Sequence, residues 1–249
     1  SRAKKNAKKK IHPGADDNAS GIAVLLEIAQ FLADLKKRGL LKMNFDICFA
    51  AWSGEEIGLV GSAHYARELE TKVKARDDNA SLPIIAYLNL DMVGRYKEKL
   101  TLHGIGSGEG WLSIIEKANV PVGLNLNPQN DSHLPTDTTS FYSRGVPILS
   151  AFTGLHQDYH SPTDTADKLN YEAAADCGKL LSRITMELLQ RDGPIPYKSS
   201  SAPKRQSRGR LTAYLGTIPD YARTDVMGVL LSGVAPEGPA QKAGLRRGD

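Results

Sequence analysis

Residues 43–62 read MNFDICFAAWSGEEIGLVGS, an alternating apolar strand pattern that runs into two adjacent glutamates, Glu55 and Glu56, before a glycine-rich entry to a helix. Neighbouring side chains at the end of a strand point in different directions. One carboxylate can therefore hold a metal ion while the other faces a water on that metal. Most Glu-Glu pairs are only solvated surface charge, so the rest of the chain has to decide between the two interpretations.

Helical and strand patterns alternate on both sides of this stretch. Residues 18–38 have the apolar period of a helix, a strand is expected at about 43–53, and a second helix begins near Gly58. Further strands are predicted in IIAYLNLDM, KLTLHGI, VGLNLN and VPILSAFTG, and further helices around WLSIIEKA and over 171–190, after an N-cap at Asn170. This alternation predicts a layered α/β fold with a mostly parallel sheet, in which ligands bind at the carboxyl ends of the strands.

The composition is that of a globular protein. The chain has 249 residues and 27.0 kDa, with 41% hydrophobic and 24% charged residues, enough for one large core and a small second module. Its longest apolar stretches contain Glu and Asp, so no membrane span is predicted. The net charge of +4 comes largely from two basic stretches with few aromatics, so no nucleic-acid partner is expected. The two cysteines, Cys48 and Cys177, lack metal-site spacing and are expected to be free and buried.

A change of composition marks a domain boundary. Residues 193–209 are rich in Gly, Pro, Ser, Lys and Arg without apolar periodicity, as in a linker. We therefore expect an α/β domain over 1–192 and an incomplete second module over 210–249.

Four possible metal ligands lie at predicted element ends: Asp16, Glu56, Asp91 and His160. Carboxylates with an imidazole, and without a thiolate, suit zinc or another borderline divalent metal in an open catalytic site.

Four motifs, GADDNASG, WSGEEIGLVGS, LNLDMVG and YHSPTDT, occur in an order and at separations that resemble the two-zinc aminopeptidases of metallopeptidase family 28. The resemblance spans residues 11–191. It implies the three-layer zinc-exopeptidase sandwich and hydrolysis of the N-terminal bond of peptides with a free N-terminus. It also implies an exported bacterial protein, whether periplasmic, secreted or in the cell envelope.

The resemblance also implies roles for the ligands. Asp16 would bridge two zinc ions, through a turn in which its peptide bond to Asp17 is expected to be cis, and Glu56 with His160 would complete one zinc. Asp91 would bind the other zinc with a histidine from an upstream His-x-Asp motif, which this sequence does not contain. We therefore expect two zinc ions in the intact protein and one complete zinc site in this chain, which would be a fragment with impaired activity.

Glu55 would then be the general base that takes a proton from the attacking water. His133 stands where relatives have a tyrosine, and we hypothesise that it donates to the oxyanion. His156 and Asp158 would support the ring of His160.

The segment 210–249 is similar to the start of a PDZ domain, with a possible carboxylate-binding loop over 214–217. An intact PDZ domain would bind a C-terminal peptide at its sheet edge. Two alternatives to the aminopeptidase remain open: a one-zinc enzyme similar to glutaminyl cyclase, and a catalytically inactive, peptidase-like binding module.

Overall fold

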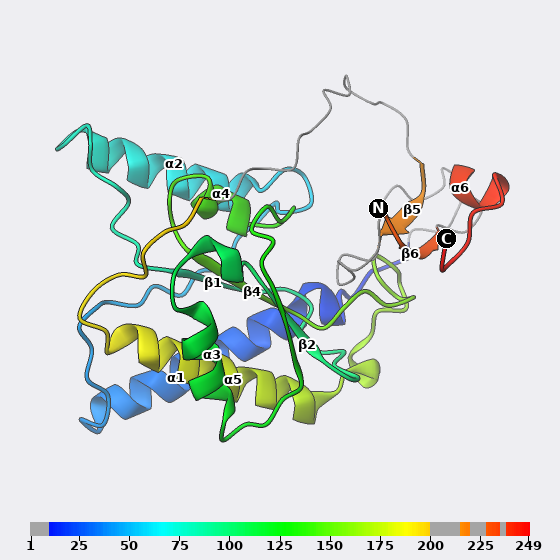
Figure 1. Cartoon of the computed structure of the whole chain (residues 1–249). Helices are drawn as coiled ribbons and strands as arrows, with labels where there is room; N and C mark the ends of the chain where they lie inside the picture. Colours follow the sequence, from blue (N-terminus) through cyan, green and yellow to red (C-terminus); the bar gives the residue numbers. More distant parts are fainter. Residues whose placement is uncertain (1–9, 200–214, 220–227, 235–237) are drawn as a thin grey trace.

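A four-stranded mixed sheet forms the centre of the chain (Figure 1). The computed structural model describes residues 10–199, 215–219, 228–234 and 238–249. Its main strands, in the spatial order β1-β4-β2-β3, are β1 (Tyr87–Leu90), β4 (Ile148–Phe152), β2 (Leu100–His103) and β3 (Leu126–Gln129). The pairs β1/β4 and β2/β3 are parallel and the central pair β2/β4 is antiparallel. The α/β fold with a mostly parallel sheet is thus confirmed.

Helices cover both faces of the sheet (Figure 1). One face carries α1 (Gly21–Lys37), α3 (Trp111–Asn119) and α5 (Tyr171–Leu189), and the other carries α2 (Val60–Lys74) and α4 (Thr138–Tyr142). Three single turns complete the described elements of this body: η1 (Ala15–Ser20), η2 (Ile105–Ser107) and η3 (Ala166–Lys168).

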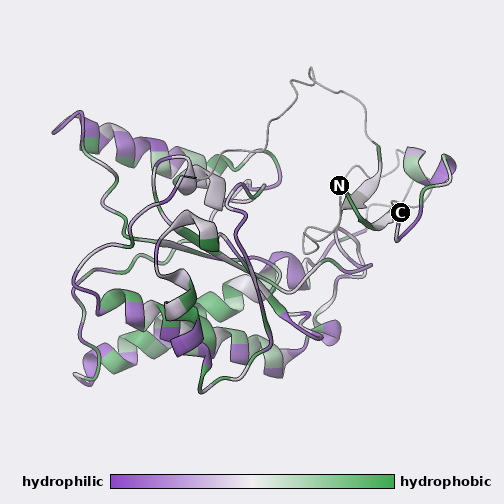
Figure 2. Cartoon of the chain, in the orientation of Figure 1, coloured by the Kyte–Doolittle hydropathy of each residue, from purple (hydrophilic) through white to green (hydrophobic). Residues whose placement is uncertain are grey.

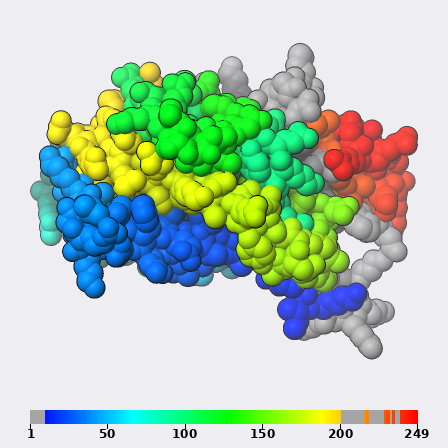
Figure 3. All heavy atoms as spheres, turned by 90° about the horizontal axis from the view of Figure 1, so that it is seen from below, coloured from blue at the N-terminus to red at the C-terminus, as the bar shows by residue number. Residues whose placement is uncertain are grey.

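The two longest buried helices are α1 and α5, which lie side by side (Figure 3). Both carry broad hydrophobic stretches, whereas α2 is mostly hydrophilic (Figure 2). Val24, Ile28 and Leu32 of α1 lie in one buried cluster with α5 residues such as Leu181. The predicted cap of α5 is confirmed, because Asn170 Oδ1 accepts a hydrogen bond from Ala173 N at 3.1 Å.

The stretch Ala15–Lys37 is long and apolar enough, by length and composition alone, to cross a membrane. Length and composition alone do not contradict the prediction that the chain has no membrane span, because core helices can also have them. The buried stripe of α1 packs against α5 inside the domain, which is the behaviour of a core helix.

The predicted strand at 43–53 is not formed. Over residues 43–47 the side chains alternate as expected, since Met43, Phe45 and Ile47 pack against the core while Asn44 and Asp46 are exposed. The alternation stops at Phe49, which is exposed. The segment forms no ladder with any strand that the structure describes, and β1 is an edge strand of the four-stranded sheet. An alternating pattern fixes which side chains face inward, but a strand also needs a neighbour to accept its backbone hydrogen bonds. Cys48, in this segment, is exposed rather than buried, whereas Cys177 is buried as expected.

The start of the predicted linker over 193–209 packs against the domain. Ile195 is buried in the main core, and Tyr197 forms an antiparallel bridge with Gly108. The rest of that linker, from residue 200, lies outside the described residues. In the second module the structure describes an antiparallel pair, β5 (Thr217–Pro219) with β6 (Leu231–Val234), and the short helix α6 (Pro239–Lys242).

The N-terminal end of α1 is fixed against the end of β1. Asn18 Nδ2 donates to Leu90 O at 2.9 Å, and Asn18 Oδ1 accepts from Gly21 N at 3.1 Å and from Met92 N at 3.2 Å. The approach is so close that a Cβ on Gly21 would lie 2.6 Å from Leu90 O. Only glycine fits at this contact.

We expect Gly21→Ala to lower the free energy of unfolding by about 1–3 kcal/mol, because the new methyl group has to displace backbone. Denaturant unfolding followed by circular dichroism measures the change. Gly193→Ala is the control, since a Cβ there meets nothing within 4 Å. An equal effect of the two substitutions would contradict the close-approach argument.

Candidate metal centre

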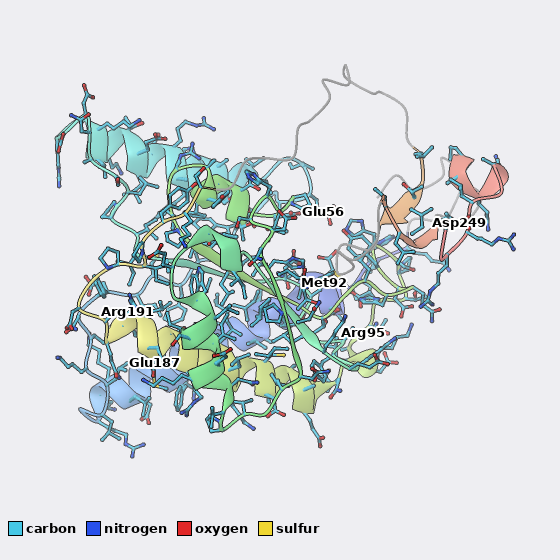
Figure 4. The ribbon with its side chains drawn as sticks, viewed as in Figure 1. Glu56, Met92, Arg95, Glu187, Arg191 and Asp249 are labelled. Carbon is cyan, nitrogen blue, oxygen red and sulfur yellow. The ribbon has the colours of Figure 1, made fainter. Side chains whose placement is uncertain are left out.

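Four segments bring charged side chains together at one edge of the sheet. Because β1 and β4 are parallel, their carboxyl ends meet at this edge. Asp91 directly follows β1, and the loop after β4 carries His156 and His160. The turn before α1 and the loop before α2 supply the other residues. Glu56 and Met92 lie on this side of the domain, away from Glu187 and Arg191 near its opposite end (Figure 4).

Three side chains form the tightest group: Asp17, Glu56 and His160. One ligand atom from each lies within 4.8 Å of the others. His160 Nε2 lies 3.0 Å from Asp17 Oδ2 and also contacts Glu56 Oε1. This nitrogen is buried, yet it satisfies hydrogen-bond geometry with no residue that the structure describes. Two carboxylate oxygens and an unsatisfied imidazole nitrogen that face one another fit a zinc ion.

Asp16 is not part of this group, and its predicted role as a bridging zinc ligand stays a prediction. Its side chain is fully buried. Its carboxylate accepts hydrogen bonds from Gly94 N at 2.7 Å and Ser20 Oγ at 3.0 Å, and it lies 3.1 Å from His156 Nε2. The neighbouring residue, Asp17, takes the position expected of Asp16. The cis peptide bond likewise lies one position further on than expected, between Asp17 and Asn18.

Glu55 and Asp91 lie beside the group as further carboxylates. Burial, followed by the charge of Asp137, raises the pKa of Glu55 to about 7. Burial, followed by the charge of Asp17, raises the pKa of Asp91 to about 7. A carboxyl group with a pKa near neutrality is suited to accept and release a proton. Asp91 is not part of the three-residue group, and its predicted role as a ligand stays a prediction.

Asp137 is the acidic residue to which the sequence pattern gave no role. It accepts a hydrogen bond from Ser62 Oγ at 2.5 Å, and burial raises its pKa. It directly precedes α4, a helix of five residues that the sequence pattern did not predict. His133, the hypothesised oxyanion donor, packs edge-on against Tyr142, with ring centroids 5.1 Å apart. Its role stays a hypothesis.

A cavity of about 990 Å³ opens at the site. Its acidic lining consists of Asp17, Asp46, Glu55, Glu56, Asp91 and Asp137. From there it runs between the segment 44–52 and β1 to apolar side chains such as Ile28 and Leu188. The cavity therefore joins the charged group to a large apolar surface.

The loops that leave β1 and β4 are bonded to each other. Thr153 donates to Met92 O from its backbone N at 3.0 Å and from its Oγ1 at 2.6 Å. Met92 and His160 both adopt positive φ, at 55° and 52°. Side chains other than glycine avoid this region unless the surroundings hold them there, and such residues cluster at functional sites.

Residues 4–185 match Peptidase family M28. Aminopeptidase YwaD of Bacillus subtilis is 25% identical over 189 residues, which are 72% of this chain and 39% of that protein. An aminopeptidase of Pseudomonas aeruginosa is 44% identical over 151 residues, which are 57% of this chain and 26% of that protein. The chain thus spans well under half the length of these two curated relatives.

Solved structures of aminopeptidases have a similar fold. A zinc aminopeptidase from Bacillus subtilis superposes with a TM-score of 0.59 at 25% identity, covering 77% of this chain and 50% of that one. The aminopeptidase from Aneurinibacillus sp. strain AM-1 superposes with a TM-score of 0.58 at 28% identity, covering 78% of this chain and 44% of that one.

Without metal, we expect the protein to lose stability as the pH rises from about 4 to about 7. The folded chain keeps protons on Glu55 and Asp91 in a range where the unfolded chain has released them, so the free energy of unfolding falls with rising pH. Asp17 raises the pKa of His160, which acts in the same direction. The loss should be on the order of 2 kcal/mol.

Denaturant unfolding in the presence of a chelator, repeated across this pH range, measures the loss of stability. Glu55→Gln should flatten the profile, and a stability that rises throughout would contradict the assignment.

We expect Asp17→Asn to weaken zinc binding by about 100-fold or more, because an amide oxygen replaces a charged ligand. Competition with a chromophoric chelator measures the affinity. Asp78→Asn, in an exposed loop, is the matched control and should bind zinc as the unsubstituted chain does. Equal affinities for the two variants would exclude Asp17 as a ligand.

Proposed function

We propose that this chain, which belongs to Peptidase family M28, is the catalytic part of a zinc-dependent aminopeptidase that hydrolyses the N-terminal bond of peptides. The observation that carries the proposal is the convergence of Asp17, Glu56 and His160. Two of these residues, Asp17 and Glu56, line one cavity together with Glu55. The relatives and solved structures described above are aminopeptidases, which also supports the proposal.

In this proposal Asp17, Glu56 and His160 hold a zinc ion. Zinc bound there would polarise the scissile carbonyl and lower the pKa of a water. Asp91 lies beside the group as the ligand predicted for a second zinc, and its charge interacts with that of Asp17.

Glu55 acts as the general base. It is adjacent in sequence to the ligand Glu56 but is not part of the three-residue group, so its oxygens are free to face the substrate. It would take the proton of the attacking water and deliver it to the leaving amine. The raised pKa of Glu55 favours both halves of this transfer.

The remaining carboxylates fit a substrate with a free N-terminus. Asp91 and Asp137 line the cavity together with the ligands and Glu55. Their negative charge would attract the ammonium group of a peptide, and the apolar part of the cavity would take a hydrophobic side chain.

Two further proposals concern the rest of the protein. We propose that residues 1–192 form the peptidase domain and that 210–249 belong to a PDZ-like module that would bind a C-terminal peptide. The antiparallel pair β5/β6 and the bond from Ala240 N to Leu215 O, 2.9 Å long, support the module. Its suggested carboxylate-binding loop, 214–217, lies partly outside the described residues. We also propose export from a bacterial cell, on the sequence resemblance alone.

We expect the zinc-loaded protein to release aniline from an aminoacyl anilide, and a chelator to abolish the release. Glu55→Gln should retain zinc but lose about 100- to 10,000-fold in rate, since general-base catalysis contributes that much. Glu27→Gln, on the exposed side of α1, is the control and should keep the full rate.

The alternatives have different outcomes. A protein similar to glutaminyl cyclase would release ammonia from a peptide with N-terminal glutamine without cutting a peptide bond. An inactive binding module would bind zinc or peptide without releasing aniline. Either result would overturn the aminopeptidase proposal.

A further inference from the structure

We propose that Arg95 is a positioning residue of the metal centre, which ties the loop that carries His160 to the turn that carries Asp17. The inference rests on the proposed function in one respect: Asp17, Glu56 and His160 have to be a zinc site.

Arg95 lies four residues after Asp91, on the same side of the domain as Glu56 and Met92 (Figure 4). Its side chain is 13% exposed, and its Nη2 lies 3.3 Å from Asp158 Oδ2 and 3.2 Å from Asp164 Oδ1. One guanidinium nitrogen therefore bridges two buried carboxylates. Arg95 N also donates to Thr153 Oγ1 at 3.3 Å, which fixes the start of the side chain against the loop that leaves β4.

Asp164 connects Arg95 to the turn before α1. Its second oxygen accepts hydrogen bonds from Asp16 N at 2.9 Å and from Asp17 N at 3.1 Å. Its backbone oxygen accepts from Ala15 N at 3.2 Å. Three successive residues of the turn are thus bonded to Asp164, and the charge of this buried carboxylate is balanced by Arg95.

Asp158 connects Arg95 to the turn that contains His160. Its backbone oxygen accepts from Ser161 N at 3.0 Å, which closes the turn around His160. Its other carboxylate oxygen accepts from Lys168 Nζ at 2.7 Å and from Thr163 Oγ1 at 2.5 Å.

Removal of the guanidinium would leave two buried carboxylates facing each other with less compensation. Their repulsion would push Asp164 away from Asp158 within the loop after β4. The turn of Asp17, which is bonded to Asp164, would then shift relative to His160, which lies two residues from Asp158. A loss of ligand alignment weakens metal binding, typically by about 10- to 100-fold when a residue behind the ligands is removed. Arg95 contacts neither substrate nor metal in this arrangement, so its effect acts through the two turns.

The test compares zinc affinity with the stability of the metal-free protein. Zinc alone is the probe, in competition with a chromophoric chelator, at a temperature where every variant is folded. We expect Arg95→Met to bind zinc about 10- to 100-fold more weakly. Arg95→Lys keeps the positive charge but lacks the planar guanidinium, so we expect a smaller loss of zinc affinity than for Arg95→Met. Because the charge is kept, this variant should also fold more readily.

Arg144→Met is the matched control. Arg144 is 22% exposed and also pairs with a carboxylate, at 2.9 Å from Glu70 Oε2, but it contacts neither ligand-bearing turn through any bond that the structure describes. It should lose stability without a change in zinc affinity.

A purely structural Arg95 would behave like Arg144. If Arg95→Met and Arg95→Lys lose stability but bind zinc as tightly as the unsubstituted chain, the inference is overturned. If the unsubstituted chain binds zinc and Arg95→Met binds it weakly, but neither releases aniline, the inference stands and the aminopeptidase proposal fails. A chain that binds no zinc overturns both.

Discussion

The parallel pairing of β1 with β4 is the constraint on which the site depends. In its register Leu90 lies opposite Ala151, so the chain leaves both strands at the same edge and at the same level. Asp91 follows one exit and the loop to His160 follows the other. A shift by one residue would turn Asn89 and its neighbours to the opposite face and part the two loops. The bonds from Thr153 to Met92 O hold the exits together beyond the last ladder pair.

The fold brings together carboxylates whose negative charges repel one another. Asp17, Glu55, Glu56, Asp91 and Asp137 share one cavity, and the pKa of Glu55 and of Asp91 rises to about 7 because the charged forms are poorly solvated and repel one another. A fold selected only for stability would not gather these groups. A bound cation relieves the repulsion, so the feature that costs stability in the metal-free chain is the one that would give it affinity for metal.

A second set of carboxylates lies behind this acidic group and stabilises the turns. Asp16, Asp158 and Asp164 are buried and accept hydrogen bonds from backbone, hydroxyl or cationic donors. They hold turns, whereas Asp17 and Glu56 remain free to bind. The motifs GADDNASG and YHSPTDT thus each contain one residue of the group Asp17, Glu56 and His160 and one buried acid, Asp16 or Asp164, behind it. Adjacent residues differ in role because consecutive side chains of a non-helical turn point in opposite directions.

The sequence by itself determined the α/β class, the cap of α5, the inward residues of 43–47 and the motifs that supply Glu55, Glu56 and His160. These follow from local periodicity, from capping chemistry and from resemblance. Tertiary structure decided the rest: that Asp17 and not Asp16 joins Glu56 and His160, that Asp137 shares the cavity, that Arg95 bridges Asp158 and Asp164, and that 43–53 forms no strand. Each of these depends on partners far away in the chain, because side-chain direction at a turn and strand pairing are set by the residues that a segment packs against.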